Sequence, residues 1–200
     1  MVQGQVNSGD ASPVPDKPKP AGGFEALDAC HQRVLAQVAE LKALVTAIEG
    51  GDITPAMRAS AAAIAQFLGG DARRHHEDEE RHIFPPLLAS GDAELVQNVL
   101  RLRQDHGWLE QDWLELAPHV QALATGYGTC DVDELREGTA ILADLYREHI
   151  ELEESIVYPA ARARIGPAGQ DEMTREMIRR RRAERSGRRT GSTESKPSSP

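Results

Sequence analysis

The chain has few cysteines and no long apolar run. Its two cysteines, Cys30 and Cys130, lie far apart in the 200-residue sequence, which excludes a disulfide scaffold as the basis of its stability. Because no stretch of about 18 or more apolar residues occurs, a transmembrane helix is not predicted and no membrane contact is expected. The first residues also lack the apolar segment of a signal peptide. We therefore expect a cytoplasmic protein.

Alternation of polar and apolar residues is equally scarce, so no sheet is predicted. Apolar residues make up 40% of the chain, which is enough for the core of one domain. They recur with helical spacing between Phe24 and about Ile165. We predict an all-α protein in three parts: a disordered leader at residues 1–22, a helical domain at 23–165, and a basic flexible tail at 166–200 with room for a short helix.

Positive charge is scarce outside this tail. The net charge is −9, yet residues 160–200 carry eleven Lys and Arg against five Asp and Glu, which leaves −15 on the rest of the chain. An acidic domain of this kind is not expected to bind nucleic acid. The run of arginines at residues 179–182 is interpreted as part of a solubilising tail, and a contact between this tail and a protein partner is left open.

Four long helices are predicted, at about residues 24–49, 55–82, 92–124 and 131–157. Thr54 and Asp92 are predicted to cap the second and third helices, and Gly50 with Gly51 to end the first. Helices of roughly 25 to 33 residues joined by short loops predict an up-down-up-down antiparallel four-helix bundle.

A short repeat contains the histidine and glutamate residues that are candidates for a chemical function. The spacing His-x3-Glu-x5-Pro starts at His75 with Glu79, and it occurs again at His149 with Glu153. The second and fourth helices of such a bundle run parallel. The repeat therefore predicts two equivalent His/Glu pairs at the same depth.

Helical periodicity turns both pairs towards the apolar faces of their helices, together with one histidine on each of the other two helices. This inward set is His31, His75, Glu79, His106, His149 and Glu153. Burying these groups without partners is costly, whereas a cation removes the cost. Imidazole and carboxylate ligands suit iron, manganese or zinc, and two glutamates on different helices can each bridge two ions. Ferritin-type bundles use Glu-x-x-His instead.

Other polar residues near the motifs are interpreted mainly as solvent-facing. Because each residue turns a helix by about 100°, His76 is predicted to lie on the surface or to support the site without ligating. His82 is left open as a ligand or channel residue, and Tyr146 as a neighbour of the metal site. The acidic residues beside the motifs are predicted to form solvated faces: Glu77, Asp78, Glu80, Glu151 and Glu154.

This order of residues resembles the hemerythrin HHE family. The resemblance rests on four motifs, each on a separate predicted helix, and covers about residues 23–165. It implies a centre of two iron ions joined by an oxo or hydroxo group. The implied terminal ligands are His31, His75, His106 and His149. The implied bridging residues are Glu79 and Glu153.

The chain departs from the oxygen-carrying hemerythrins, which have a second histidine one turn after the one that corresponds to His106. Here Glu110 stands at that position, in phase with His106, and it is predicted as a third carboxylate ligand. A more anionic site favours Fe(III) and weakens reversible oxygen carriage. The departure shifts the prediction from an oxygen carrier towards a sensor or redox protein.

Together these features predict a cytoplasmic di-iron protein that binds or senses a small ligand, namely O2, NO or peroxide. An alternative is an enzyme-like protein that turns over NO or peroxide, or that supplies iron for the repair of iron centres. A third hypothesis is a signalling module whose tail contacts a partner.

Overall fold

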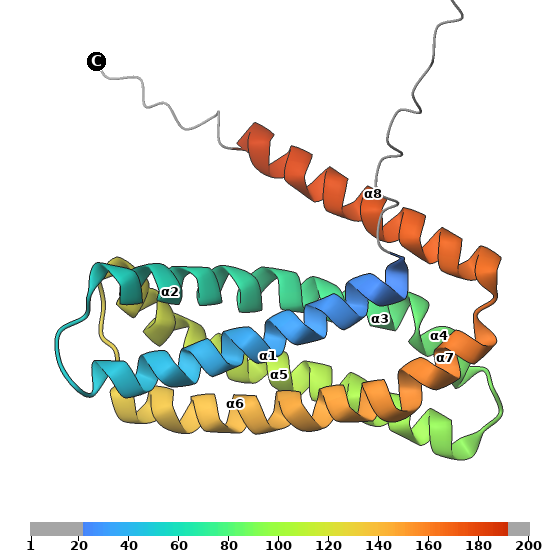
Figure 1. Cartoon of the computed structure of the whole chain (residues 1–200), viewed down its shortest axis with the longest axis horizontal. Helices are drawn as coiled ribbons and strands as arrows, with labels where there is room; N and C mark the ends of the chain where they lie inside the picture. Colours follow the sequence, from blue (N-terminus) through green and yellow to red (C-terminus); the bar gives the residue numbers. More distant parts are fainter. Residues whose placement is uncertain (1–21, 192–200) are drawn as a thin grey trace, which may run out of the picture.

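The structure, a computed structural model, describes residues 22–191, although not the side chains of residue 185 and residues 187–191. Most of the described residues lie in helices and none lies in a strand (Figure 1). The all-α prediction is therefore confirmed for this part of the chain. The predicted leader lies outside the described residues apart from Gly22, as does the end of the tail at 192–200.

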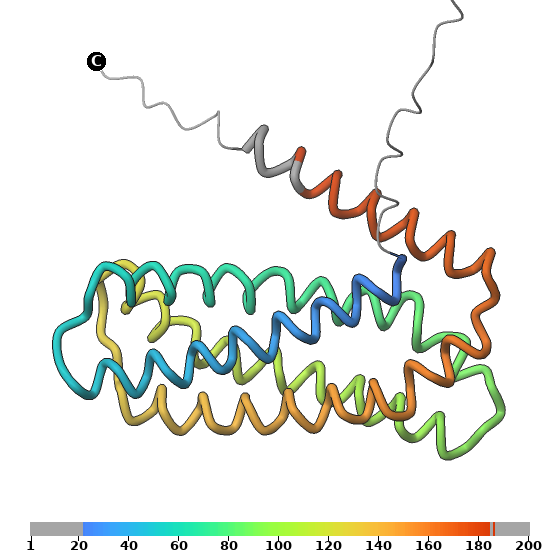
Figure 2. The backbone as a smooth tube through the Cα atoms, in the orientation of Figure 1, coloured from blue at the N-terminus to red at the C-terminus, as the bar shows by residue number. Residues whose placement is uncertain are grey.

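Several helical segments follow one another end to end, so the backbone forms a few long lines (Figure 2). In chain order the segments are α1 (Gly23–Ile48), α2 (Pro55–Gln66), η1 (Phe67–Ala72), α3 (Arg73–His82), α4 (Phe84–Leu88), α5 (Ala93–Thr125), α6 (Val132–Leu152), η2 (Glu153–Val157), α7 (Tyr158–Arg164) and α8 (Pro167–Gly191). Within residues 22–191, no helix is both long enough and apolar enough to cross a membrane.

Side-chain caps and a glycine set the helix ends, as the sequence predicts. The Thr54 hydroxyl accepts a hydrogen bond from the backbone N–H of Met57 at 3.2 Å, which satisfies one free donor at the start of α2. Asp92 and Asp131 cap α5 and α6 in the same way. Gly126 follows α5 with a φ of +75°, a conformation that favours glycine.

The helices α1, α2, α5 and α6 lie side by side around a common interior (Figure 1). The helix α1 packs against α2 and α6, and α5 packs against the same two helices. The segments η1 and α3 continue the line of α2, while η2 and α7 continue that of α6. Four helical lines thus enclose one core.

Two π-helical turns, η1 and η2, interrupt these lines. The turn η1 contains Gly69 and Gly70 and lies inside the single helix predicted for residues 55–82. A π turn holds one extra residue, so the side chains that follow are rotated by about 100° relative to an unbroken α-helix. Both turns adjoin the repeat: η1 ends shortly before His75, and η2 begins at Glu153.

The apolar core consists of two clusters separated by a layer of buried polar side chains. One cluster lies towards the α1–α2 connection and includes Leu109. The other lies towards α4 and α7 and includes Phe84 and Leu102. On α5 the buried His106 stands between Leu102 of the second cluster and Leu109 of the first. On the other helical lines, too, the buried polar side chains lie where the two clusters meet. The fold therefore places the histidines and glutamates of the motifs at one level.

The helix α8 spans 25 residues, where the sequence predicted a flexible tail with a short helix at most. It turns back after α7 and runs beside the start of α1 (Figure 1), where the Gly23 N–H donates a hydrogen bond to the Thr174 hydroxyl at 2.8 Å. Met173 and Met177, one turn apart, are both buried in the second apolar cluster. This short apolar stripe is outweighed in the tail's composition by arginine, which is why composition alone did not reveal it.

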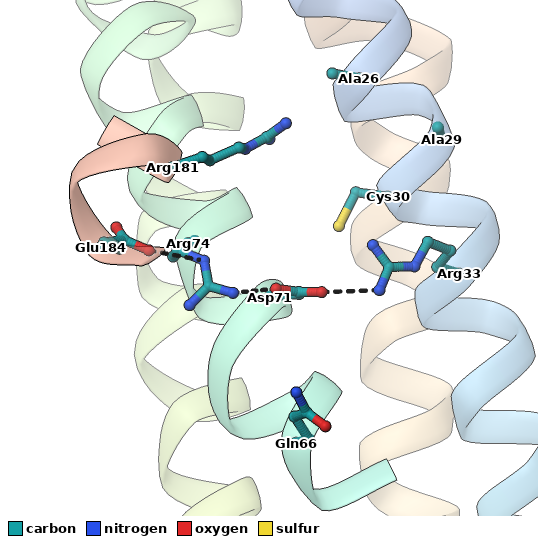
Figure 3. A pocket seen from close by; sticks show the side chains of 9 residues that line it. All are labelled: Ala26, Ala29, Cys30, Arg33, Gln66, Asp71, Arg74, Arg181 and Glu184. Carbon is teal, nitrogen blue, oxygen red and sulfur yellow. Dashed lines mark hydrogen bonds and ion pairs between the residues drawn. The ribbon is translucent and has the colours of Figure 1, made fainter. Parts of the chain in front are cut away.

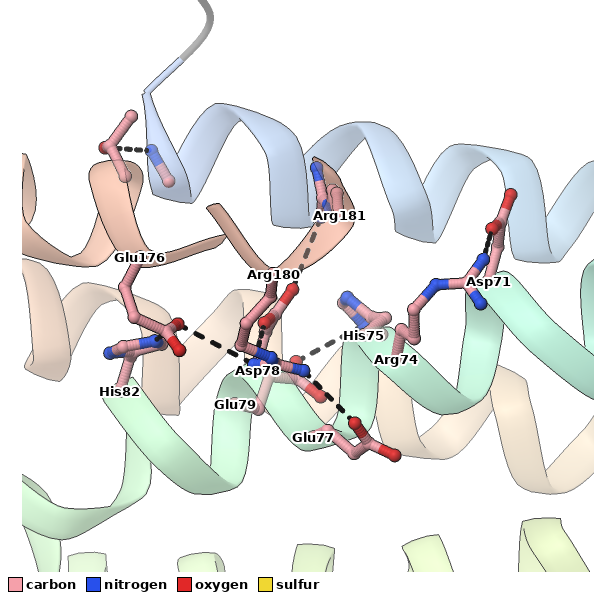
Figure 4. A network of polar contacts seen from close by, with 12 residues as sticks. Asp71, Arg74, His75, Glu77, Asp78, Glu79, His82, Glu176, Arg180 and Arg181 are labelled. Atoms are coloured by element: carbon pink, nitrogen blue, oxygen red, sulfur yellow. Dashed lines mark hydrogen bonds and ion pairs between the residues drawn. The ribbon is translucent and has the colours of Figure 1, made fainter. Parts of the chain in front are cut away.

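Ion pairs join α8 to α3 (Figure 4). Arg180 and Arg181 contact the two carboxylate oxygens of Asp78 at 2.7 and 3.3 Å, and Glu176 contacts His82 Nε2 at 2.8 Å. Burial raises the pKa of Asp78, although both arginines oppose this shift. The interpretation of Asp78 as solvated was therefore wrong, and His82 pairs with α8 rather than with the polar layer.

Met177 gives a test of this packing. Its side chain is 2% exposed, so Met177→Ala leaves a cavity and is expected to lower the free energy of unfolding by about 2 to 3 kcal/mol. Urea unfolding of the metal-free protein, followed by circular dichroism, measures the change. Arg179→Ala, on the exposed face of the same helix, should change it by less than about 0.5 kcal/mol. Equal effects of the two substitutions would contradict the packing of α8 against the second apolar cluster.

Candidate metal centre

Six polar side chains from all four helical lines meet in the layer between the two apolar clusters. Each is at most 5% exposed. Figure 4 shows two of them, His75 and Glu79, on consecutive turns of α3. The full set is His31, His75, Glu79, His106, His149 and Glu153. The structure thus brings together all six residues that helical periodicity turned inward.

The nitrogen and oxygen atoms of these side chains form two overlapping groups. In one group His31 and His75 join both glutamates, and in the other His106 and His149 join both glutamates. Within each group the ligand atoms lie within 4.8 Å of one another. Because both glutamates belong to both groups, the arrangement fits two metal ions bridged by two carboxylates.

Each glutamate directs one oxygen to each group. Oε1 of Glu79 lies 3.3 Å from His75 Nε2, and its Oε2 lies 3.4 Å from His106 Nε2. The two oxygens of Glu153 are divided in the same way. Oε2 lies 3.1 Å from Nε2 of His31 in the first group, and Oε1 lies 3.2 Å from Nε2 of His149 in the second group. Adjacent ligand atoms that each lie about 2.1 Å from one ion are about 3 Å apart, so these separations suit shared ions.

Several of these buried atoms have no hydrogen-bond partner. They include Oε2 of Glu79, both oxygens of Glu153, and Nε2 of His106 and His149. A buried polar group without a partner costs about 1 to 3 kcal/mol, and more when it is charged. Two cations would satisfy these atoms together, and the mixture of imidazole nitrogens and carboxylate oxygens fits a first-row transition metal.

Two further carboxylates orient the histidine rings. Nδ1 of His106 donates a hydrogen bond to Glu80 at 2.9 Å, and Nδ1 of His31 donates one to Glu154 at 3.0 Å. Each ring therefore turns Nε2 towards Glu79 and Glu153, where the nitrogen can bind a metal ion once it has lost its proton. A carboxylate behind a ligating imidazole fixes its orientation and raises its basicity.

The sequence interpretation of these two acids as solvated residues missed their role. Glu80 and Glu154 are half exposed, yet each directly follows a glutamate of the polar layer and supports a histidine on another helix. Asp105, which no sequence motif indicated, is buried 3.8 Å from Nδ1 of His149. The available signal was an acidic residue next to a predicted ligand in each motif.

Without metal, protons occupy part of the site. Burial by itself lowers the pKa values of His31 and His149, but the neighbouring carboxylates raise both to about 10. Burial favours the neutral form of Glu79, yet His75 and the other histidines hold its pKa well below the usual range. Burial lowers the pKa of His75 to about 4. Positive charge is thus already stabilised at the position where cations would bind.

His76 is buried, although the sequence predicted a surface or supporting position for it. Its ring stacks on His106 with centroids 4.2 Å apart, and one ring nitrogen lies within 4.8 Å of ligand atoms of His106 and His149. The predicted position holds only for an unbroken α-helix through Gly69 and Gly70. The π turn at that point rotates the residues that follow, and this rotation brings His76 into the interior.

Glu110, predicted as a third carboxylate ligand, faces away from the polar layer. Its side chain is 49% exposed and contacts Arg73 Nε at 3.4 Å. The fully inward position on this part of α5 is Leu109, and the next residue lies about 100° around the helix. His106 lies at the edge of the inward face, on the same side of Leu109. Glu110, four residues later, is rotated about 40° further from the interior and therefore faces solvent. The structure therefore does not bring Glu110 together with the six clustered side chains.

Tyr158, rather than Tyr146, contacts the predicted ligands. Its hydroxyl donates a hydrogen bond to Oε1 of Glu79 at 2.5 Å and lies 3.2 Å from Nε2 of His31. Its ring stacks on the His31 ring, and it is buried directly after the turn η2. Tyr146 lies on the other side of the layer, with its ring 6.2 Å from that of His76.

The supporting carboxylates should be measurable through metal affinity. Glu80→Gln and Glu154→Gln each remove a charge behind a ligating ring and are expected to weaken binding by roughly 10- to 100-fold. Competition with a chelator measures this change. Glu151→Gln, on the helical line of Glu154, and Glu110→Gln, on α5, alter exposed residues and should leave the affinity unchanged. A loss of affinity in Glu110→Gln would restore that residue as a ligand.

Metal binding should release protons. His31 and His149, with pKa values of about 10, are protonated at pH 7.5, and a metal ion binds only the neutral ring. Anaerobic titration with Fe(II) in a weakly buffered solution containing a pH indicator should therefore release about two protons per chain. Apparent affinity should rise with pH until these groups are neutral. Binding without proton release would contradict the protonated state of the two rings.

Comparison with known proteins agrees with this geometry. The family model described as the hemerythrin HHE cation binding domain matches residues 22–161, which is more than half of the chain and contains all six residues. A protein of Haemophilus influenzae described as uncharacterized is 27% identical over 133 residues, covering 66% of this chain and 75% of that protein. The chain therefore belongs to the hemerythrin HHE cation-binding domain family.

Proposed function

We propose that the chain holds two iron ions in its polar layer and uses them to bind or sense O2, NO or peroxide. The supporting observation is the division of the Glu79 and Glu153 oxygens between two pairs of histidines. A single ion would leave one pair of buried imidazoles without a partner. Membership of the hemerythrin HHE family favours iron among the metals that such ligands suit.

When bound, the iron ions supply the capacity to exchange electrons with a small oxygen or nitrogen ligand. The chain itself would hold and isolate them. Glu80 and Glu154 fix two rings, and the Tyr158 hydroxyl holds one oxygen of Glu79. The apolar clusters on both sides exclude bulk water, which strengthens electrostatic interactions within the layer.

We also propose that the four helical lines form an up-down-up-down antiparallel bundle of the hemerythrin type in a cytoplasmic protein. The short connections between successive lines support this topology. A protein partner for α8 is a further proposal, supported by the exposed Arg179 and Arg182. Arg180 and Arg181 are already paired with α3, which reduces the charge available to such a partner.

A second candidate is turnover of NO or peroxide rather than binding alone. The position of Tyr158 favours it, because its buried hydroxyl donates a hydrogen bond to Glu79, which belongs to both groups, and so holds a proton within the layer where reduction of NO or peroxide consumes protons. Iron supply to other centres has no comparable feature in the described residues.

Metal content and spectra test the proposed function. Aerobically purified protein should contain about two iron ions per chain and show near-ultraviolet charge-transfer bands, because the buried ligands are satisfied only by metal. Glu79→Ala removes a shared ligand and should lower the content towards zero, whereas Glu151→Ala should retain it. Adding NO to the reduced protein should change the spectrum, and consumption of NO would favour the second candidate. A colourless, metal-free protein would overturn the proposal.

A further inference from the structure

A cavity of about 380 Å³ lies between α3 and α5 and leads from the surface to the polar layer. At its inner end are the rings of His76 and His106. Its apolar wall includes Leu109, Trp113 and Tyr146. The cavity thus reaches the second group of ligands, that of His106 and His149, from one side.

The outer part of this cavity carries more negative than positive charge. Glu77, Glu80 and Glu110 line it together with Arg73 and Arg103, and Arg73 contacts Glu110 at 3.4 Å. An anion entering here would meet three carboxylates and two guanidinium groups, a lining with one excess negative charge. The lining therefore favours a small uncharged molecule over an anion.

The first group of ligands is closed by comparison. The Tyr158 ring stacks on His31 with centroids 5.2 Å apart, and both residues are buried. A second cavity of about 440 Å³, between α1, the α2–α3 line and α8, ends at Cys30 and charged residues that include Arg33 and Asp71 (Figure 3). None of the six ligands lines it. Of these two cavities, only the one between α3 and α5 reaches a ligand histidine.

His76 stands where this cavity meets the second group. It is 8% exposed, and its Nε2 has no hydrogen-bond partner. An imidazole ring carries at least one N–H, which can serve a molecule bound beside it.

We propose that the cavity between α3 and α5 is the binding site for a small uncharged ligand at the His106 and His149 side of the centre. His76 Nε2–H then donates a hydrogen bond to that ligand and does not ligate metal. Two experiments test this inference. The first, on access to the cavity, uses the metal-free protein, whereas the second uses the iron-loaded protein and therefore rests on the proposed function.

Access to the cavity can be measured by tryptophan fluorescence in the metal-free protein. The chain has two tryptophans, and the exposed Trp108 is replaced by Trp108→Phe so that only Trp113, in the cavity wall, reports. A side chain added at Gly107, which also lines the cavity, would meet open space. Gly107→Leu should therefore fill the cavity without strain and lower quenching by acrylamide at least about two-fold. Gln104→Leu, on the exposed face of α5, is the matched control.

The second measurement uses nitric oxide as the probe on the iron-loaded, reduced protein. In stopped-flow experiments Gly107→Leu should slow NO binding by about ten-fold, whereas the Gln104→Leu control should not change its rate. His76→Phe keeps the stacking on His106 but removes the donor, and should raise NO dissociation by about three- to ten-fold, as expected for one hydrogen bond. His76→Gln, which keeps an N–H group, should recover part of the loss.

Iron content separates the possible outcomes. Two irons per chain and an unchanged resting spectrum in His76→Phe support the hydrogen-bonding role, whereas loss of iron in that variant overturns it and makes His76 a ligand. Unchanged quenching and unchanged NO rates in Gly107→Leu overturn the cavity as the route. If the natural sequence binds no iron, the proposed function fails, while the quenching result still decides whether the cavity is open to small molecules.

Discussion

The burial of two carboxylates and four imidazoles inside an apolar core is the constraint on which the rest of the structure depends. Glu79 and Glu153 are fully buried, and each divides its oxygens between two histidines. Without cations, protonated histidines compensate these charges only in part, because several ligand atoms still lack partners. Such an arrangement is costly for stability alone and makes sense as a site that metal completes.

The surrounding elements hold this layer in register. The two π turns adjoin the repeated motifs and rotate the residues after them, which brings His76 and Tyr158 against the ligands. The helix α8 braces α3 from outside through Asp78 and His82, next to the helical turns that carry His75 and Glu79. A helix that composition suggested was a loose tail is therefore part of the support of the site.

The two halves of the centre are chemically alike but differently enclosed. Tyr158 covers the half that contains His31, while a cavity reaches the half that contains His106. A site with one covered and one accessible half can admit a small molecule and keep bulk water from the rest of the layer. This asymmetry arises from side chains that are not ligands, so it is independent of the symmetric repeat that supplies the ligands.

The sequence alone determined the helical fold class, the principal caps and the six inward residues, because helical periodicity and local capping depend on neighbours in the chain. It also carried the resemblance to the family. The tertiary structure decided the places of His76, Glu110, Glu80 and α8. A π turn breaks the regular rotation on which periodicity relies, and a residue at the edge of a helix face turns inward or outward according to what packs against it. Such contacts join residues far apart in sequence, so no local pattern encodes them.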